Sequence, residues 1–456
     1  HEVLGRRERR SRVSTMLDAV KISHVEKRLQ QYPHELSGGM RQRVMIAMAM
    51  LCQPQVLIAD EPTTALDVTI QAQILELMRE LQQAFSTSLL LITHDMGVVA
   101  EMADDVLVMS HGKIMEQAPA KTLFTSPQAA YTRQLLQAVP VLGQAPALAP
   151  VEATRPLLSV RDLSVRFPVR GDGLRVRREV HAVDGVSFDL FPGETLGIVG
   201  ESGCGKSTLV RTILQIHPAT EGEVIFEGQN ILKLEGEALR QNRRKIQMVF
   251  QDPTAAFNPK MRVKDILCEP LLNFGLLKNS EVDAKAAELL QMVELPVEFK
   301  DRFPHSMSGG QRQRLGIARA LSLEPQIIVC DEATSALDVS VQEKICELLV
   351  RLQREKDITY LFICHDIGLV DLMSHQVAVM YLGNVVELLE KGRLSVNGVH
   401  PYTKALIKSI FKVDFKPGEK IQPLEGDIPS PLALPLGCPF QSRCEYCQEI
   451  CRSEKP

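Results

Sequence analysis

Eight consecutive residues have the types and spacing needed to hold a chain of phosphates. The run reads Gly200-Glu201-Ser202-Gly203-Cys204-Gly205-Lys206-Ser207. It follows a predicted buried strand (194–199) and opens a predicted helix (206–214) that includes Thr208. Glycines let backbone N–H groups curl around an anion, and the helix N-terminus adds a favourable dipole. We expect this loop to bind a nucleotide, with Lys206 contacting the β- and γ-phosphates and the Ser207 hydroxyl reaching Mg²⁺.

Two carboxylates end a second apolar stretch. Asp331 and Glu332 follow Ile327–Cys330, and the carboxyl end of such a strand is where phosphates would lie. Asp331 suits Mg²⁺ coordination through water, and Glu332 suits activation of an attacking water. His365 follows a third apolar stretch and is a candidate contact for the γ-phosphate. Gln251 lies between the loop and Asp331 along the chain and is a further candidate for the metal and the water.

The chain repeats itself at a constant spacing. Five short motifs recur 271 residues later, with no net insertion or deletion between them. The pairs are Ser37–Arg43 with Ser308–Arg314, Asp60-Glu61 with Asp331-Glu332, Ala65–Asp67 with Ala336–Asp338, His94-Asp95 with His365-Asp366, and Tyr131-Thr132 with Tyr402-Thr403. The spacing predicts that both halves share one fold. It also makes a chance acidic pair at a strand end, or a purely structural histidine, the weaker interpretation.

The repeat divides the chain into segments. We expect a partial first domain over 1–139, a Pro- and Ala-rich linker over 140–156, a complete second domain over 157–411 and a Pro-, Gly- and Cys-rich extension over 412–456. The counterpart of the glycine-rich loop would lie ahead of His1, so the first domain is expected to be truncated at its N-terminal end. Short apolar stretches alternate with helical patterns, which predicts α/β domains with mainly parallel sheets.

Composition argues against several classes of protein. Hydrophobic residues make up 45% and charged residues 24% of the 456 residues, as in ordinary globular proteins. The formal net charge of -4 lacks the basic excess typical of nucleic-acid-binding proteins. No apolar run approaches the roughly 18–20 residues of a membrane-spanning helix, so we expect any membrane role to be peripheral.

The order of these motifs resembles that of the ABC ATPase family. The motifs are the glycine-rich loop, Gln251, Ser308-Gly309-Gly310-Gln311, Asp331-Glu332, Asp338 and His365. The resemblance implies tandem P-loop NTPase domains, each with a helical subdomain, that hydrolyse ATP with Mg²⁺. It also implies a head-to-tail sandwich in which each ATP lies between the P-loop of one domain and the Ser-Gly-Gly signature of the other.

The same resemblance implies roles for residues in both halves. Ser37, Gly38 and Gly39 would complete the site of the second half, and Ser308, Gly309 and Gly310 would serve the opposite site. Asp67 and Asp338 match the D-loop aspartates, which communicate across the sandwich, and Phe167 is the candidate for stacking on adenine. Three residues depart from the family pattern: Met40, Met307 and Ala333. None of the three removes a contact to phosphate, Mg²⁺ or water.

Segments outside the ATPase core resemble the ATP-binding proteins of oligopeptide, dipeptide and nickel importers. They are Tyr131–Leu136, His400–Leu406, Gly426–Pro431 and Gly437–Cys444. The tandem arrangement looks closest to that of bacterial glutathione importers. The resemblance implies peptide import (dipeptide, oligopeptide or glutathione) from a peripheral position on the cytoplasmic face of the inner membrane. The implied partners are two integral-membrane permease subunits and a periplasmic substrate-binding protein, with no direct nucleic acid.

Two other functions compete with import. A soluble tandem ABC ATPase that acts on ribosomes or nucleic acid usually joins its halves by a long charged helical arm, whereas this linker is short and rich in Pro and Ala. A DNA-repair or chromosome-maintenance ATPase would need zinc modules or coiled coils inserted within its domains. The constant spacing of 271 residues leaves no room for such insertions in the shared part.

Four cysteines crowd into the C-terminal extension: Cys438, Cys444, Cys447 and Cys451. In a protein whose other cysteines are scattered, such crowding favours a metal or iron–sulfur site over disulfides. Members of the importer family can carry a cluster in this region. A small irregular module with unligated thiols is the other interpretation.

Overall fold

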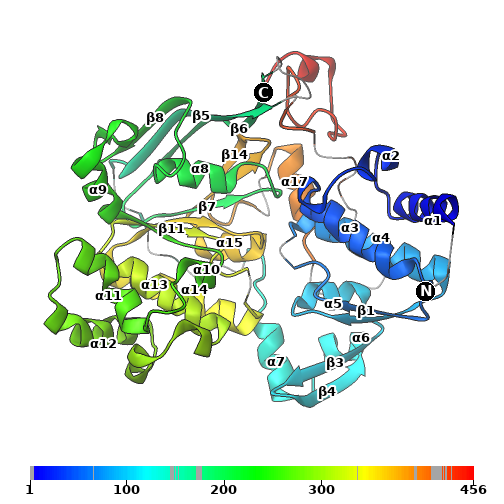
Figure 1. Ribbon diagram of the computed structural model, residues 1–456, viewed down its shortest axis with the longest axis horizontal. Helices are drawn as coiled ribbons and strands as arrows, with labels where there is room; N and C mark the ends of the chain where they lie inside the picture. The colour runs from blue at the N-terminus through cyan, green and yellow to red at the C-terminus, as the bar shows by residue number, and fades with distance from the viewer. Residues whose placement is uncertain are drawn as a thin grey trace. The chain divides into compact units, whose positions relative to one another are not determined.

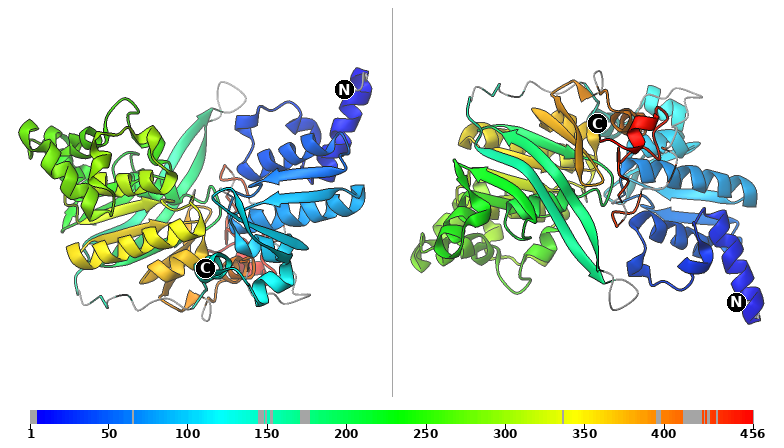
Figure 2. Two further views of the ribbon diagram at one scale, coloured as in Figure 1. Left: turned by 90° about the horizontal axis from the view of Figure 1, so that it is seen from below. Right: turned by 90° about the horizontal axis from the view of Figure 1, so that it is seen from above.

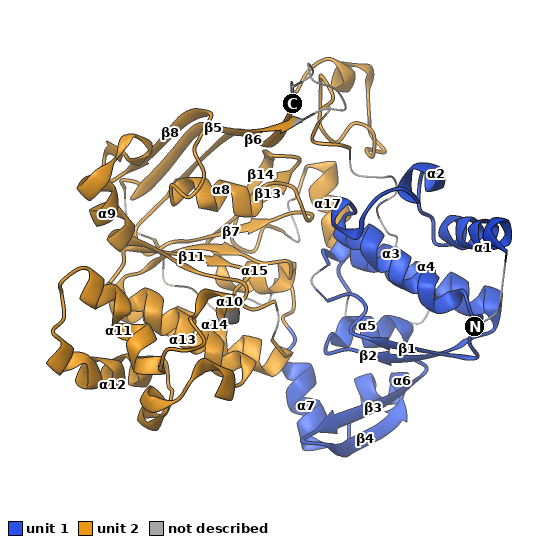
Figure 3. Cartoon of the chain, viewed as in Figure 1, with its two compact units in different colours: residues 1–139, 408–424 blue, residues 140–407, 425–456 orange. Residues whose placement is uncertain are grey.

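The computed structural model of the chain contains two compact units. It describes residues 5–64, 66–143, 148, 150–151, 154–170, 177–335, 337–394, 398–411, 424, 426, 429–432 and 434–455. Unit 1 comprises residues 1–139 and 408–424, and unit 2 comprises residues 140–407 and 425–456 (Figure 3).

A six-stranded sheet forms the centre of unit 2 (Figure 1). Its strands, in order, are β10 (Ile246–Val249), β11 (Ile327–Asp331), β12 (Thr359–Ile363), β7 (Thr195–Val199), β13 (Gln376–Tyr381) and β14 (Asn384–Glu390). All neighbours pair in parallel except β13 and β14, which are antiparallel. Strands β7, β11 and β12 are buried at every position, which explains their continuous apolar sequences. The predicted α/β class with a mainly parallel sheet is confirmed.

A second sheet, which is antiparallel, packs with the helix α8 (Lys206–Ile213) against the central sheet. Its order is β6 (Arg177–Leu190), β5 (Leu158–Arg170), β8 (Glu221–Phe226) and β9 (Gln229–Asn230). Figure 2 shows β5 and β6, in teal and green, as a long pair of strands. Both sheets and α8 share one hydrophobic core, to which Val160, Leu209 and Val329 contribute. This core holds β7 and α8 in place and so positions the loop between them.

The remaining helices of unit 2 include a helical subdomain. The α-helices other than α8 in this described part of the chain are α9 (Gly236–Lys245), α10 (Pro253–Ala256), α11 (Val263–Asn273), α12 (Val282–Met292), α13 (Gly309–Leu321), α14 (Val339–Lys356), α15 (Ile367–Met373) and α17 (Pro401–Lys408). Helices α11, α12 and α13 pack on one another. Helix α13 begins directly after Ser308, so the second signature lies on this subdomain.

Unit 1 repeats elements of unit 2 with the bounds expected from the sequence spacing. Its elements are α1 (Arg6–Ala19), α2 (Val25–Arg28), α3 (Gly38–Met50), β1 (Val56–Asp60), α4 (Val68–Phe85), β2 (Ser88–Ile92), α5 (Met96–Met102), β3 (Asp105–Ser110), β4 (Lys113–Pro119), α6 (Ala120–Thr125) and α7 (Ala130–Gln137). The parallel pair β1–β2 corresponds to β11–β12, and the antiparallel pair β3–β4 corresponds to β13–β14. Helices α3, α4 and α5 correspond to α13, α14 and α15. The prediction that both halves share a fold is confirmed for these elements.

One apolar face of unit 1 is more exposed than its counterpart in unit 2. Ile58 and Leu90 of β1 and β2 are 64% and 53% exposed, whereas the matching Val329 and Leu361 are completely buried. In unit 2 these two residues belong to the core that includes α8 and the antiparallel sheet. The difference therefore lies on the face that α8 covers in unit 2.

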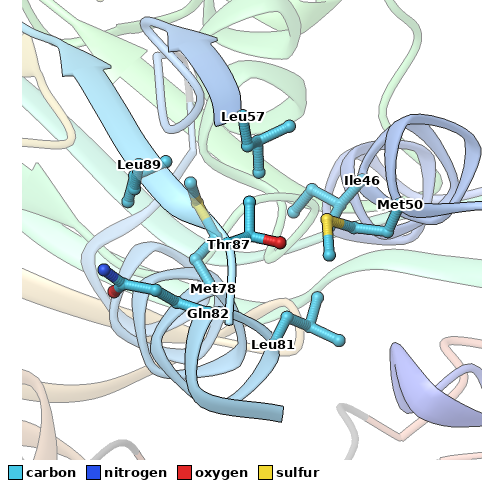
Figure 4. A pocket seen from close by; sticks show the side chains of 8 residues that line it. All are labelled: Ile46, Met50, Leu57, Met78, Leu81, Gln82, Thr87 and Leu89. Atoms are coloured by element: carbon cyan, nitrogen blue, oxygen red, sulfur yellow. The ribbon is translucent and has the colours of Figure 1, made fainter. Parts of the chain in front are cut away.

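A hollow in unit 1 lies between α3, α4 and the β1–β2 pair (Figure 4). Its lining is mainly apolar and consists of Ile46, Met50, Leu57, Met78, Leu81, Gln82, Thr87 and Leu89. In unit 2 the larger Tyr360 and Ile358 occupy the positions of Leu89 and Thr87, and both are buried. The Tyr360 hydroxyl also donates a hydrogen bond to the Leu349 carbonyl at 3.1 Å. Smaller side chains in unit 1 account for the hollow without a ligand.

Candidate active site

The glycine-rich loop joins β7 to α8 in unit 2, and three of its glycines cannot be replaced without strain. Gly200, Gly203 and Gly205 have φ angles of +152°, +79° and +106°. A Cβ atom would lie 2.2 Å from the Met380 carbonyl oxygen at Gly200, and 2.1 Å from that of Ala182 at Gly205. Ser202 and Gly203 are exposed at the tip of the loop. The backbone therefore passes close to its neighbours at both ends and opens to solvent in the middle.

Lys206 lies at the first position of α8 and turns back into the loop. Its Nζ donates to the carbonyl oxygens of Gly200, at 2.7 Å, and Glu201, at 3.2 Å. Only 4% of the residue is exposed. The loop thus places a desolvated cation beside its own backbone. Ser207 and Thr208 follow Lys206 in the first turn of α8.

Ser207 and Asp331 come together although they are 124 residues apart. The Ser207 hydroxyl donates to Asp331 Oδ1 at 3.1 Å, and Arg211 Nη2 lies 4.0 Å from Asp331 Oδ2. Burial is the largest influence on Asp331 and raises the pKa of its carboxyl above the usual value, although the Ser207 hydrogen bond opposes this change. A hydroxyl and a carboxylate in contact provide the oxygen ligands that Mg²⁺ prefers.

Glu332 lies between two other candidate residues. His365 Nε2 is 2.6 Å from Glu332 Oε1, and Gln251 Nε2 donates to Glu332 Oε2 at 2.5 Å. Burial acts to raise the pKa of Glu332, but the hydrogen bond and charge of His365, helped by Lys206, outweigh burial and hold this pKa below its usual value. The ionised carboxylate that a general base requires is therefore favoured.

The backbone at this glutamate is strained in both halves of the chain. Glu332 has φ of 52° and its counterpart Glu61 has φ of 47°. Both lie in the left-handed region, which residues other than glycine rarely adopt. Such conformations are often found at functional sites. Glu61 also contacts the matching histidine, with His94 Nδ1 3.1 Å from Glu61 Oε1. The repeat thus extends to backbone conformation and to the glutamate–histidine contact.

The residues present fit a magnesium nucleotide. Ser207 and Asp331 offer a hydroxyl and a carboxylate, and Lys206 offers a cation in the adjoining loop. His365 Nδ1 is buried and, among the described residues, has no hydrogen-bond partner. A phosphate oxygen or a water bound there would satisfy this nitrogen. Gln251 contacts Glu332 rather than the Ser207–Asp331 pair in this structure.

The two signature elements cap equivalent helices. The Ser37 and Ser308 hydroxyls each accept a hydrogen bond, from the backbone N–H of Met40 and Gln311 respectively, at 3.3 Å. Gln311 also accepts a bond from the Ser308 N–H at 3.0 Å, which completes a capping box. The Met40 side chain cannot make this second bond because it ends in a thioether. This departure weakens the cap of α3 and leaves the serine in place.

The glycines of the signature elements pack closely on the helices that follow the acidic pairs. A Cβ at Gly39 would lie 2.8 Å from Ile70 Cγ2, and one at Gly310 would lie 2.5 Å from Val341 Cγ1. At Gly38 and Gly309 the nearest atoms are leucine methyls at 3.7 and 3.5 Å. The second glycine of each pair is therefore required for close packing of α3 on α4 and of α13 on α14.

The two aspartates that are predicted to be D-loop residues differ in their contacts. Asp67 is buried, and its Oδ1 accepts from the Ile70 N–H at 3.0 Å and from the Thr69 hydroxyl at 2.6 Å. Asp338 is exposed and makes no capping bond to the described residues of α14. The Asp338 carboxylate is thus more accessible than that of Asp67.

Phe167 lies on β5, partly buried against the core of unit 2. Its ring meets that of His217 edge to face, with centroids 5.6 Å apart. His217 follows the C-terminal end of α8, whereas the phosphate loop lies at the other end of that helix. Stacking of Phe167 on adenine stays a prediction.

The C-terminal cysteines provide no support for the predicted metal or iron–sulfur cluster. Over the described part of the chain, no group of three or more His, Cys, Asp or Glu residues is arranged to hold a metal ion. All ten cysteines are free thiols. The backbone closes this segment on itself, because the Cys438 N–H donates to the Cys451 carbonyl at 2.8 Å. Crowding along the sequence brings the cysteines into one small module without creating a ligand set.

Sequence reasoning missed two residues that contact the glycine-rich loop. Tyr402 and Arg443 both bond to Glu201, its second residue. Tyr402 belongs to one of the repeated motif pairs, and Arg443 lies in a motif that resembles importer extensions. Those signals identified the segments, but nothing in the sequence placed them against the loop.

The fold and the site define a nucleotide hydrolase of the ABC class. A family model described as ABC transporter matches residues 1–64 and 183–335. A second, described as the C-terminal region of oligopeptide/dipeptide transporters, matches residues 115–163 and 386–451. The chain belongs to the ATP-binding proteins of ABC transporters, which are ATPases. In the part of the chain that the structure describes, no helix has the length and apolar character needed to cross a membrane.

Among curated proteins, the chain is similar to the glutathione import ATP-binding protein GsiA of Pectobacterium atrosepticum. It is 48% identical to that protein over 457 residues, which cover 95% of this chain and 73% of the relative. It is 50% identical over 437 residues to the protein of the same name from Escherichia coli K12, covering 90% of this chain and 70% of the relative. Among solved structures, the ATP-binding cassette MJ0796 bound to ADP and Pi matches with a TM-score of 0.46 and 31% identity, over 51% of this chain and 98% of that one.

Replacing Asp331 by Asn is expected to stabilise the nucleotide-free protein. The carboxylate is buried, lies next to Glu332 and is only partly compensated by Ser207 and Arg211. The isosteric amide removes the desolvation penalty, so a gain of about 1 kcal/mol would raise the melting temperature of unit 2 by about 2–4 °C. Differential scanning fluorimetry without and with Mg²⁺ and ATP measures the effect. We expect the ligands to stabilise the unaltered protein more than the variant. A lower melting temperature for the ligand-free variant would contradict this argument.

Proposed function

We propose that this chain is the ATP-hydrolysing subunit of a bacterial ABC importer for peptides, namely dipeptides, oligopeptides or glutathione. One observation carries the hydrolytic part: Glu332 is held by His365 and Gln251 beside the Ser207–Asp331 pair at the glycine-rich loop. The relatives named as glutathione import proteins and the match to an oligopeptide/dipeptide transporter model support the import of peptides. These relatives do not favour the alternative of a soluble ATPase acting on ribosomes or nucleic acid.

In the proposed mechanism, each residue of the site has a separate task. Lys206 neutralises charge on the β- and γ-phosphates, while Ser207 and Asp331 would hold Mg²⁺, which would supply further neutralisation of phosphate charge. Glu332 accepts the proton of the attacking water, and His365 and Gln251 hold its carboxylate in place. Positioning and charge neutralisation together supply most of the catalysis in this reaction class.

The domain assignment is part of the same proposal. We assign residues 1–139 to a first ABC ATPase domain, 157–411 to a second and 412–456 to an extension, with 140–156 as the linker. Ser37, Gly38 and Gly39 remain the predicted signature contacts for the second half, and Ser308, Gly309 and Gly310 those for the opposite site. The D-loop role of Asp67 and Asp338 is likewise a prediction from the family resemblance.

The proposed partners are two integral-membrane permeases and a periplasmic substrate-binding protein. The subunit would lie on the cytoplasmic face of the inner membrane and contact the membrane through the permeases. Closure of its domains on ATP, and their opening after hydrolysis, would change the access of the permeases from one side of the membrane to the other. Support comes from the similarity of the chain to glutathione import ATP-binding proteins.

ATPase activity of the full protein, reconstituted with its cognate permeases in proteoliposomes, tests this function. The substrate-binding protein is added empty, loaded with glutathione or loaded with a dipeptide mixture. Stimulation by one loaded form would support import and identify the class of cargo. Basal hydrolysis that responds to none of the three forms of the binding protein would contradict the import function. A soluble ATPase would then be the better explanation.

A further inference from the structure

A buried ion pair joins the C-terminal extension to the glycine-rich loop. Arg443 Nη1 donates to Glu201 Oε2 at 2.7 Å, and Nη2 donates to Oε1 at 3.0 Å. Each side chain is only 1% exposed. Two parallel bonds between a guanidinium and a carboxylate are the strongest arrangement of such a pair, and they fix the orientation of both groups. The pair spans 242 residues of the sequence and lies within unit 2.

A carboxylate in this loop needs a counter-ion for an electrostatic reason. Glu201 is the second residue of the run that would surround phosphates, so its negative charge would repel them. Burial makes this repulsion stronger, because little water is present to screen it. Arg443 cancels the charge and pulls the carboxylate toward the extension. Arg443 is therefore part of the electrostatic environment of the phosphate site.

A second contact fixes the backbone of the same loop residue. The Glu201 N–H donates to the Tyr402 hydroxyl at 2.9 Å, and both residues are buried. Tyr402 belongs to α17, which lies between the ATPase core and the extension in sequence. Its ring packs against Tyr381, with centroids 4.6 Å apart. Glu201 is thus held through its side chain by one segment and through its backbone by another.

The extension is anchored firmly enough to act on the loop. Phe440 is buried, and its ring packs against Tyr381 and Tyr402 at centroid distances of 5.2 and 5.4 Å. The Pro431 carbonyl accepts a hydrogen bond from the His181 N–H at 3.2 Å. Lys455 forms an ion pair with Asp184 near the end of the chain. These contacts are spread over the extension, shown in red in Figure 1, so Arg443 is presented by a packed module.

We propose that Arg443 is a positioning residue of the phosphate-binding loop, through which the C-terminal extension sets the affinity of the loop for ATP. This inference rests on the proposed ATPase function and adds a determinant outside the ATPase motifs. In this proposal Arg443 acts on the loop through Glu201. The extension is then required for nucleotide binding, and not merely attached to the domain.

Steady-state ATPase kinetics on the full protein test this proposal with four variants. They are Arg443→Met, Arg443→Lys, Glu201→Gln and the double variant Arg443→Met with Glu201→Gln. Arg443→Met removes the guanidinium that forms two hydrogen bonds to the buried Glu201 carboxylate, so we expect KM for ATP to rise about tenfold or more, with kcat changed less than about threefold. The double variant removes both charges and is expected to restore KM to within about threefold of the unaltered protein. Arg443→Lys keeps the positive charge but cannot form the two parallel hydrogen bonds. Its KM for ATP is therefore expected to lie between those of Arg443→Met and the unaltered protein.

The matched control is Arg452→Met, which removes an exposed arginine of the same extension and should change neither KM nor kcat. A purely structural pair would lower the melting temperature of Arg443→Met and leave KM of the folded protein unchanged, and that result would overturn the proposal. A double variant as impaired as Arg443→Met would overturn it as well. If Arg443→Met does not fold, the KM values of Arg443→Lys and of the double variant are compared with that of the unaltered protein instead. An unaltered protein that fails to bind or hydrolyse ATP would instead refute the proposed function itself and this inference with it.

Discussion

Replacing Glu332 by Gln is expected to lower ATP turnover about 10²- to 10⁴-fold while leaving ATP binding largely intact. The amide keeps the size of the side chain and can still contact Gln251 and His365. It cannot accept a proton from the attacking water. The lost step is therefore chemical, and Lys206, Ser207 and Asp331 remain available to hold the nucleotide. Phosphate release measures turnover, and titration with a fluorescent ATP analogue measures affinity.

Glu355→Gln is the matched control for this experiment. Glu355 lies on α14, is more than half exposed and pairs only at the surface with Arg351. The control should keep full turnover, because a surface ion pair contributes little to stability. Turnover of Glu332→Gln within about threefold of the unaltered protein would show that another group activates the water. To separate hydrolysis at the opposite site from hydrolysis at this one, the assay is repeated on a chain that carries both Glu332→Gln and Glu61→Gln.

Replacing Lys206 by Ala is expected to weaken ATP binding about 10- to 100-fold and to reduce turnover with it. The Nζ atom is buried within the loop, 2.7 Å from the Gly200 carbonyl. A desolvated cation forms strong charge-assisted bonds to phosphate, each worth about 1.5–3 kcal/mol, and tenfold in affinity corresponds to about 1.4 kcal/mol. Isothermal titration with ATP in excess Mg²⁺ measures the dissociation constant.

Lys233→Ala provides the comparison for the lysine experiment. This lysine is 78% exposed and lies 3.8 Å from Glu223, so its removal should leave affinity unchanged. Thermal unfolding of ligand-free Lys206→Ala distinguishes a binding defect from a folding defect. We expect little loss of stability, because removal of a buried cation relieves its desolvation. Affinity of Lys206→Ala within about threefold of the unaltered protein would refute the proposed role in phosphate binding.

Much of the fold could be predicted from residues that are close in sequence. The buried strands β7, β11 and β12 are continuous apolar runs, and the predicted helix at the glycine-rich loop matches α8 within one residue. The spacing of 271 residues predicted the bounds of whole elements in unit 1 from those in unit 2. Local packing was not predictable in this way. The hollow at Leu89 depends on which side chains of α3, β1, α4 and β2 face one another.

The candidate site likewise has features that the sequence predicts and contacts that it does not predict. The sequence alone determined the phosphate loop, the acidic pair and the histidine, because each is a contiguous motif at the end of a predicted strand, where parallel topology collects side chains at one edge. Only the tertiary structure decided which partners they meet: Ser207 with Asp331, Gln251 with Glu332, and Arg443 with Glu201. A pairing across 81 to 242 residues leaves no periodicity in the chain, because it is set by how the sheets, helices and extension pack and not by local backbone preference.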